Sequence, residues 1–192
     1  GSIFIAGAGI QWLRDRMKFF KKASETEKLV KSLKDNNNIY LVPAFTGLGA
    51  PHWDANARGV LTGITRDTSP REIVRATIEA VAYQTYDLFE AMKHDGLRPK
   101  IVKVDGGMVM NNWFSQFLSD IINVKVLRPN VQETTAAGAA FMAGLQIGVY
   151  KSLKDISKIW HLDKKFSPNM SNKSRNHLLK GWSSAIKKTL TN

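Results

Sequence analysis

Hydrophobic side chains recur at helical spacing through residues 70–94, and capping signals stand at both ends of this stretch. Ser69-Pro70-Arg71-Glu72 forms a complete capping box with proline at the first helical position. Gly96 follows the stretch and is a typical helix terminator. We therefore expect one long helix from residue 70. Its apolar stripe consists of Ile73, Ala76, Thr77, Ala80, Val81, Gln84 and Leu88.

Shorter apolar runs and helical patterns alternate along the rest of the chain, which predicts an α/β fold. The predicted strands lie in the opening segment GSIFIAGAGI and at residues 39–45, 60–65, 101–105 and 124–127. Another helix is predicted to begin near residue 10. Further helices are predicted over residues 26–34, 112–122 and 135–147 and at the lysine-rich end of the chain. We expect the last helix to dock its apolar face on the domain, after a surface connection over residues 166–174.

The length and composition favour one folded unit. With 192 residues and 43% hydrophobic content, the chain has enough material for one sizeable core. We expect one domain over residues 1–192, in which residues 150–192 form a basic helical segment packed on the rest. The absence of cysteine excludes a disulfide framework and indicates a reducing, cytoplasmic location. No apolar run approaches the roughly 20 residues that span a bilayer, so no membrane partner is expected.

The positive charge is concentrated near the end of the chain. Of 28 basic residues, ten lie within residues 151–192, where only Asp155 and Asp163 oppose them. Nine of these ten are lysines, and they are dispersed rather than interleaved with stacking aromatic side chains. This distribution favours a solvated lysine-rich face over a nucleic-acid partner.

A Gly-Gly turn is the sharpest functional feature of the pattern. Residues 101–112, IVKVDGGMVMNN, join an apolar strand to a helix through Gly106 and Gly107. Because ligands collect at the carboxyl ends of strands in open α/β sheets, this turn is a candidate nucleotide or phosphate site. An ordinary tight turn explains the same two glycines, and the local sequence leaves both interpretations open.

Each polar residue on either side of this turn could have a structural role or a ligand-binding role. Asp105 is either a metal-facing carboxylate or a cap of the following turn, and capping is favoured. Asn111 and Asn112 are natural caps of the next helix, although an asparagine there can also turn its amide toward a purine or ribose.

Two other glycine-containing segments are less specific. Gly7 and Gly9 precede a predicted helix and resemble the start of GxGxxG, but Trp12 occupies the third glycine position. The helix over residues 135–147 is rich in alanine and glycine, which favours tight packing against a sheet over direct ligand contact.

Several common catalytic arrangements are missing from the chain. His52, His94, His161 and His177 do not have metal-ligand spacing, and there is neither a GxxxxGK[ST] phosphate loop nor a GxSxG elbow. His52 and Asp54 share a loop, where a turn-forming aspartate beside a partly exposed histidine is favoured over acid/base chemistry. No residue of this chain is assigned as catalytic or as a metal ligand.

Longer motifs carry a resemblance to a known family. Gly59-x-Leu61-x-Gly63-Ile64 is followed, after seven residues, by Glu72-Ile73-x-x-Ala76-Thr77-Ile78-Glu79. This pair fits the second signature of the FGGY carbohydrate kinases without departure, and the resemblance covers essentially the whole chain. Residues 42–59, VPAFTGLGAPHWDANARG, and residues 6–15, AGAGIQWLRD, are similar to the branch of this family that phosphorylates glycerol. Pentulose kinases usually carry a GER-type sequence at positions 47–50.

The resemblance implies a ribonuclease H-like C-terminal domain of the actin-like ATPase type, in which two domains close over a nucleotide. DGG at residues 105–107 resembles the adenosine motif of these proteins. By matched position, Gly107 and Asn111 contact the adenosine side of the nucleotide. Gly7 and Gln11 are the other implied ATP contacts.

The implied activity is transfer of the ATP γ-phosphate to glycerol, giving sn-glycerol 3-phosphate with Mg²⁺ as cofactor. The family's catalytic aspartate and its glycerol-binding residues match positions upstream of Gly1, so the fragment alone is expected to be inactive and to meet glycerol only through the missing N-terminal half. It is also expected to lack the first strands of its domain, which leaves strand 101–105 with an exposed edge. A homo-oligomer is expected. The alternatives are another FGGY kinase, acting on a pentulose or aldonate, and a non-catalytic module that binds nucleotide or acidic partners.

Overall fold

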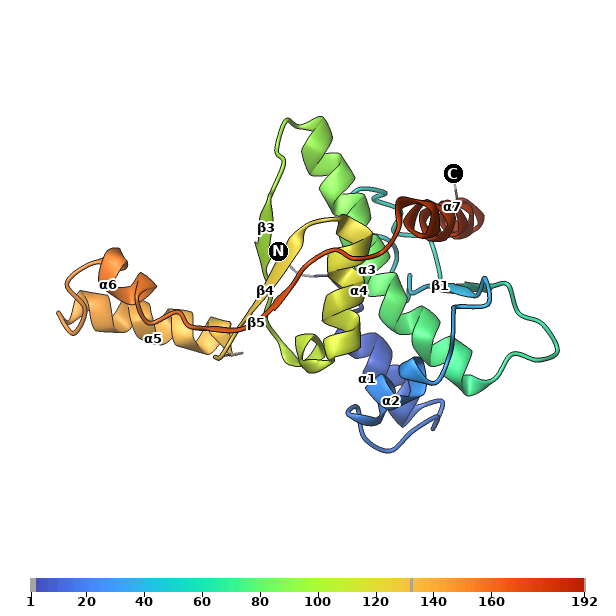
Figure 1. The fold of residues 1–192 in the computed structure, drawn as a ribbon, viewed down its shortest axis with the longest axis horizontal. Coiled ribbons are helices and arrows are strands. Elements are labelled where there is room, and N and C mark those ends of the chain that lie inside the picture. The colour runs from blue at the N-terminus through green and yellow to red at the C-terminus, as the bar shows by residue number, and fades with distance from the viewer. Residues whose placement is uncertain (1–2, 132, 192) are drawn as a thin grey trace.

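The structure, a computed structural model, describes residues 3–131 and 133–191 (Figure 1). Helices and strands alternate along most of the chain, as the α/β prediction required. The helices are α1 (Gly7–Asp15), α2 (Glu25–Lys31), α3 (Pro70–His94), α4 (Asn112–Ile122), α5 (Thr134–Gln146), α6 (Leu153–Ser157) and α7 (Asn172–Thr189). The strands are β1 (Tyr40–Val42), β2 (Val60–Thr62), β3 (Ile101–Lys103), β4 (Lys125–Pro129) and β5 (Leu162–Phe166), and a 3-10 turn covers Gly107–Met110.

The long helix α3 runs through the middle of the helical body, and its predicted ends are confirmed (Figure 1). The Ser69 hydroxyl accepts from the Arg71 amide at 3.3 Å, and the Glu72 carboxylate accepts from the Ser69 amide at 2.9 Å. Gly96 has φ +84°, a backbone conformation that glycine adopts without a steric penalty. The buried first half of α3 therefore serves as the scaffold on which the other elements pack.

A charged pair lies inside this scaffold. Glu79 is fully buried, and its carboxylate accepts from Arg75 Nε at 2.7 Å, from the Tyr83 hydroxyl at 2.9 Å and from Asn36 Nδ2 at 3.3 Å. Burial raises the pKa of Glu79, although the charge and hydrogen bonds of Arg75 oppose the shift. Arg75 also donates to the carbonyl of Leu33 at 2.9 Å, so the pair links α3 to the segment after α2.

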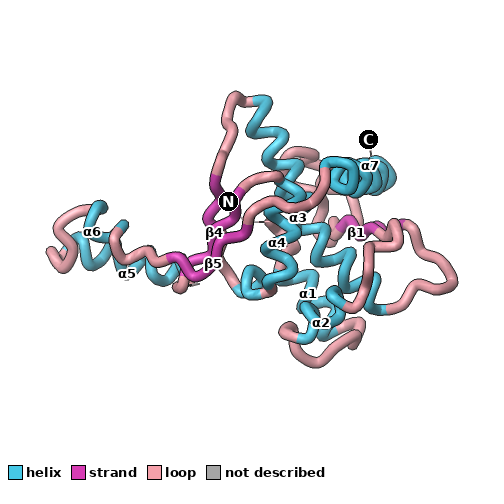
Figure 2. The backbone as a smooth tube through the Cα atoms, viewed as in Figure 1, coloured by secondary structure: helices cyan, strands magenta, loops and turns pink. Residues whose placement is uncertain are grey.

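Residues 3–131 and 133–191 form two small sheets. β1 and β2 are antiparallel, with Tyr40 opposite Thr62. In the second sheet β4 lies in the middle, parallel to β3 and antiparallel to β5. Figure 2 shows this sheet between the helical body and the segment that carries α5 and α6.

β3 is an edge strand of the second sheet, and its exposure corrects the expectation of a buried apolar run. The Ile101 side chain is 55% exposed, and the strand pattern alternates between exposed and half-buried positions. β3 pairs only with β4 among the described residues, so its other edge has no strand partner there. The predicted exposed edge at this strand is thereby confirmed.

α5 does not pack tightly against a sheet, so that interpretation of its small residues is wrong. The helix projects away from the body together with α6 (Figure 1), and Gly144 is its buried residue. Tyr150 lies against Gly144 and in edge contact with Phe141, at a ring-centroid distance of 5.8 Å. These contacts are local to the projecting segment, which explains why so much of its surface stays exposed.

Two boundaries near the chain ends also differ from the predictions. Residues 3–6 form a turn rather than a strand, and α1 begins at Gly7, several residues earlier than its apolar spacing indicated. β5 was not predicted, because four of its five residues are exposed and three of them are charged. Its partner β4 supplies the pairing that the local sequence does not reveal.

The last helix, α7, docks on the body as expected from its apolar face. Trp182, Ala185 and Ile186 are buried, and the Trp182 ring stacks on Tyr83 at a centroid distance of 5.2 Å. The indole Nε1 also donates to Asp87 at 2.8 Å, which ties α7 to α3. Over the described part of the chain, the helices are too short or too polar to cross a lipid bilayer.

Candidate functional site

One cavity of about 650 Å³ brings together all of the residues that the resemblance implied as nucleotide contacts. Gly7 and Gln11 line it from α1, and Gly107 and Asn111 line it from the turn between β3 and α4. These two groups are about one hundred positions apart in the sequence. The start of α2 closes a third side of the cavity. Its volume falls within the range of about 300–1,000 Å³ that is typical of small-molecule sites.

α1 presents its first turn to the cavity. Its N-cap, Ala6, provides no side-chain hydrogen bond, and no acidic residue occupies the first turn. The first amide groups of a helix have no partner within the helix, so this end favours an anion. The sequence predicted a helix start near residue 10, which would put Gln11 in the first turn. Because α1 begins at Gly7, Gln11 lies in its second turn instead. The two residues are four positions apart and therefore share one helix face.

The glycine turn offers bare backbone to the cavity. Gly106 has φ +89° and ψ 166°, a conformation that is essentially confined to glycine. A Cβ atom built on Gly107 would meet no heavy atom within 4 Å, so the space above this residue is open. The turn therefore permits a ligand to approach the main chain closely, which is the property that made it a candidate.

Buried hydrogen bonds hold this turn from behind. Arg128 is 5% exposed and donates from Nη1 to the carbonyl of Val109 at 2.8 Å and to that of Met110 at 3.3 Å. Its Nε pairs with Asp163 at 2.6 Å. The Ser115 hydroxyl also donates to the Val109 carbonyl, at 2.9 Å. The turn is thus a fixed part of the structure rather than a loose connection.

Asn111 is confirmed as the cap of α4. Its Oδ1 accepts from the Phe114 amide at 3.0 Å, and its Nδ2 makes no hydrogen bond with the described residues. Capping fixes the orientation of the side-chain amide and leaves this NH₂ group for a ligand. Asn112 is the first residue of the helix rather than its cap, and its Oδ1 accepts from Lys164 at 3.3 Å.

Asp105 does not cap the following turn, so the favoured interpretation of this residue is wrong. It is exposed at the cavity wall, and the N-cap of the 3-10 turn is Gly106, with no side-chain cap hydrogen bond. Its carboxylate makes no hydrogen bond or ion pair with the rest of the described chain. The described residues contain no cluster of three metal-ligating side chains.

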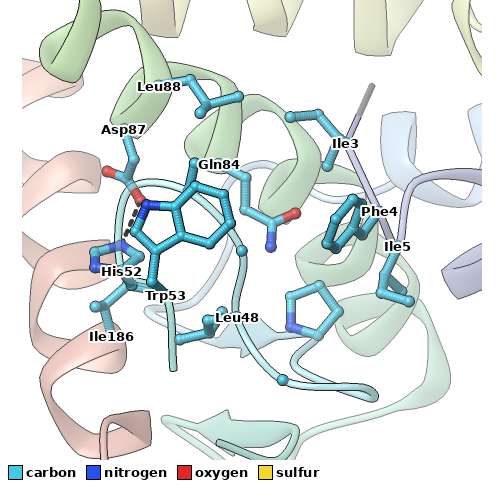
Figure 3. A pocket seen from close by; sticks show the side chains of 14 residues that line it. Ile3, Phe4, Ile5, Leu48, His52, Trp53, Gln84, Asp87, Leu88 and Ile186 are labelled. Carbon is cyan, nitrogen blue, oxygen red and sulfur yellow. Dashed lines mark hydrogen bonds and ion pairs between the residues drawn. The ribbon is translucent and has the colours of Figure 1, made fainter. Parts of the chain in front are cut away.

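A second, smaller cavity of about 180 Å³ is lined by His52 among other residues (Figure 3). His52 Nε2 lies 3.4 Å from the Asp87 carboxylate, which also accepts a hydrogen bond from the indole Nε1 of Trp182. Figure 3 shows mainly apolar side chains around this pair, among them Phe4 and Leu88. His52 makes no hydrogen bond with Asp54, whose partners are Asn56, Ala57 and Thr191.

Asp54 is instead a turn-forming residue, as favoured from the sequence. Its Oδ1 accepts from the amides of Asn56 and Ala57, both at 3.0 Å, and its Oδ2 accepts from the Thr191 amide at 2.7 Å. The hydrogen bond from the Thr191 amide is the largest cause that lowers the pKa of Asp54 below 3.8.

The lowered pKa predicts how the contribution of Asp54 depends on pH. This carboxylate stabilises the folded chain above pH 3.8, its ordinary pKa, and the stabilisation is lost as the pH falls through the lower folded-state pKa. We expect Asp54→Asn to melt below wild type at pH 7, with the difference shrinking in strong acid. Thermal unfolding of both proteins between pH 2 and pH 7 checks this, and a difference that does not depend on pH would contradict it.

Comparison with known proteins identifies the family to which the chain belongs. Residues 1–147 match the C-terminal domain of the FGGY family of carbohydrate kinases, and the chain belongs to this family. It is 54% identical over 188 residues to glycerol kinase 1 of Pseudomonas aeruginosa, covering 98% of this chain and 38% of that protein. It is 49% identical to the glycerol kinase of Gluconobacter oxydans, covering 100% of this chain and 38% of that protein.

Solved structures show the same relationship. The crystal structure of Plasmodium falciparum glycerol kinase with ADP superposes with a TM-score of 0.87 at 35% identity, covering 100% of this chain and 38% of that one. A xylulose kinase from Lactobacillus acidophilus superposes with a TM-score of 0.77 at 25% identity, covering 95% and 37%. The chain thus spans about 38% of the length of the glycerol kinases that it matches.

Sequence reasoning missed the contribution of α2 to the cavity. Ala23, Ser24, Thr26 and Glu27 all line it, although their segment carries no recognisable ligand motif. Arg14 lines it as well and pairs with the neighbouring Asp15 at 2.6 Å. The residues at the start of α2 can be recognised as part of the site only in the folded structure, where α2 packs beside α4.

Proposed function

We propose that this chain is the C-terminal part of an ATP-dependent glycerol kinase and that its larger cavity forms the adenosine-side wall of the ATP site. The observation that carries the proposal is the convergence of Gly7, Gln11, Gly107 and Asn111 on that one cavity. Identity of about 50% to glycerol kinases supports the choice of glycerol as substrate. The P. falciparum glycerol kinase structure with ADP supports a nucleotide as ligand.

In this proposal the two ends of the cavity take different parts of the nucleotide. The backbone at Gly107 and the Asn111 NH₂ group would contact the adenosine side, where a glycine wall permits close approach. Gly7 and Gln11 would contact the remainder of ATP, beside a helix end whose amides favour negative charge. The chain would thereby bind and orient ATP, while the base and the glycerol pocket would come from the part of a glycerol kinase that this chain does not match.

Mg²⁺ fits this cavity only together with the phosphates. Mg²⁺ is usually held by one or two carboxylates plus substrate phosphates and keeps several waters. Asp105 lines the cavity beside Gly107, at the end proposed for adenosine, and the Glu27 carboxylate already accepts a hydrogen bond from Lys31, so neither carboxylate is assigned as a ligand of the phosphate-bound ion. When bound with ATP, Mg²⁺ would neutralise charge on the phosphates.

Substrate choice can be tested in the protein at the length that its gene encodes. We expect ATP-dependent phosphorylation of glycerol at least tenfold faster, as kcat/KM, than that of xylulose or gluconate. This margin corresponds to a difference in transition-state binding of about 1.4 kcal/mol. A coupled assay that detects ADP measures all three substrates under identical conditions. Turnover of xylulose without turnover of glycerol would overturn the assignment and leave another FGGY sugar kinase.

The whole chain is proposed to act as one domain, with α7 as an integral part of it. The stacking of Trp182 on Tyr83 and its hydrogen bond to Asp87 support this assignment for α7, whereas α6, which also lies within residues 150–192, projects away from the body. The exposed edge of β3 supports association with further polypeptide, either the preceding part of the same protein or a second copy. Light scattering on the protein as its gene encodes it distinguishes a monomer from the expected homo-oligomer.

A further inference from the structure

Glu27 lies where two walls of the larger cavity meet. It lines the cavity from α2, and its side chain is 24% exposed. One carboxylate oxygen, Oε2, accepts from the Asn112 amide at 3.3 Å, and the other, Oε1, accepts from Lys31 at 2.5 Å. The contact with Asn112 joins α2 to α4 across 85 positions of the sequence.

This contact completes the start of α4. The first amides of a helix have no acceptor within the helix, so each needs a partner from elsewhere. In α4 the Phe114 amide donates to Asn111, and the Asn112 amide donates to Glu27. A carboxylate at this position is also favoured by the partial positive charge of the helix N-terminus. Glu27 therefore caps α4 from a neighbouring helix, beside the residue that is proposed to contact adenosine.

The charge of Glu27 suits this role. Burial alone would raise its pKa, but hydrogen bonds from Lys31 and from the Asn112 amide outweigh burial, and the pKa is lowered. Glu27 is therefore a carboxylate at neutral pH, and an ionised carboxylate can only accept hydrogen bonds. Hydrogen bonds to charged groups are worth more than those between neutral groups.

The geometry points to Glu27 as a positioning residue of the nucleotide site, acting through α4 to hold the Asn111 amide against the cavity. This inference rests on the proposed function, because it assigns Glu27 to the ATP site described above. Asn111 faces a constraint on each side: its own Oδ1 is fixed by the Phe114 amide, and the next residue in the chain is fixed by Glu27. Loss of the second constraint would let the first turn of α4 fray and would move the Asn111 NH₂ group.

Three variants separate the hydrogen bond from the charge. Glu27→Ala removes both contacts, Glu27→Gln keeps an oxygen that can accept from the Asn112 amide, and Lys31→Met removes only the ion pair. We expect Glu27→Ala to weaken ADP binding about five- to tenfold, less than the full value of one hydrogen bond to a charged group, because the contact acts on the nucleotide only through α4. Lys31→Met should stay within about twofold of wild type, because an ion pair this exposed contributes little. Glu27→Gln should fall between wild type and Glu27→Ala, because its amide oxygen still accepts from the Asn112 amide but carries no charge.

The measurement is isothermal titration of ADP into the protein at the length that its gene encodes, together with ATP kinetics. A positioning role raises the KM for ATP in Glu27→Ala and leaves kcat unchanged within about twofold. A purely structural role lowers the active fraction, and with it kcat, without changing KM. This split distinguishes the two roles even if the variant is somewhat less stable.

Each outcome bears on a different statement. Unchanged ADP affinity in Glu27→Ala overturns the positioning role and leaves the proposed function intact. Equal weakening in Glu27→Gln and Glu27→Ala also overturns it, because charge rather than the hydrogen bond would then be responsible. A wild-type protein that does not bind ADP at all sinks the proposed function, and the positioning role falls with it.

Discussion

Replacing Gly107 with arginine is expected to weaken ADP binding at least about 100-fold, a loss of roughly 3 kcal/mol. The physical reason is steric: a side chain at this position grows into open cavity space, since a Cβ there meets no heavy atom within 4 Å. The same open space means that the fold should tolerate the substitution. Isothermal titration of ADP, with thermal unfolding of the same samples, measures both effects.

Two matched substitutions define what this result means. Gly107→Ala adds only a methyl group and should cost less than tenfold in affinity. Gly106→Ala adds the same methyl group one position earlier, where φ is +89°, and should destabilise the fold by about 1–3 kcal/mol. ADP binding of wild-type strength in Gly107→Arg would contradict the assignment of the cavity to the nucleotide.

Replacing Arg75 with methionine is expected to lower the free energy of unfolding at pH 7 by about 3–5 kcal/mol, the usual cost of leaving a buried charge without its partner. Glu79 is fully buried and would lose its hydrogen bond to Arg75 Nε, which is 2.7 Å long. Arg75 is also over the Trp113 ring, at 5.1 Å from the ring centroid, so its removal costs packing as well. Urea denaturation of the variant and of wild type measures the difference.

The loss of folding stability caused by Arg75→Met should depend on pH, and the pKa of Glu79 determines the direction of that dependence. Because burial raises the pKa of Glu79 above 4.5, the stability associated with its bound proton is fully present below pH 4.5 and is lost as the pH rises through the folded-state pKa. Removing Arg75 raises that pKa further, so the variant should lose stability more steeply than wild type above pH 4.5. Adding Glu79→Gln to the variant should remove the extra pH dependence. A cost below about 1 kcal/mol at pH 7 would contradict this account of the pair.

Local sequence signals were sufficient where an element is stabilised by its own residues. The capping box at Ser69 and the Asn111 cap fix the starts of α3 and α4 through contacts within four positions of the sequence. These two starting points could therefore be predicted. β5 depends on pairing with β4, which lies more than 30 positions earlier in the chain, and local periodicity does not contain that information. The start of α1 was misplaced because its first residues are small and carry no side-chain cap.

The candidate site divides in the same way. The glycine turn was visible in the sequence because a Gly-Gly pair after an apolar strand has few explanations, but its link to Gly7 and Gln11 came from resemblance alone. The role of α2 was not predictable. Glu27 reaches Asn112 only because α2 and α4 pack beside one another, and nothing in the sequence around Glu27 indicates that neighbour.

The diagnostic motif over residues 72–79 marks the framework rather than the chemistry. Glu72 serves to start α3, and Glu79 is sealed inside the body, so neither carboxylate is available to a ligand. Of the motif residues, Ile78 is the one that lines the larger cavity. The motif therefore indicates how α3 is built and does not by itself indicate which substrate is bound. A substitution within it should be judged as a folding defect before it is judged as a loss of specificity.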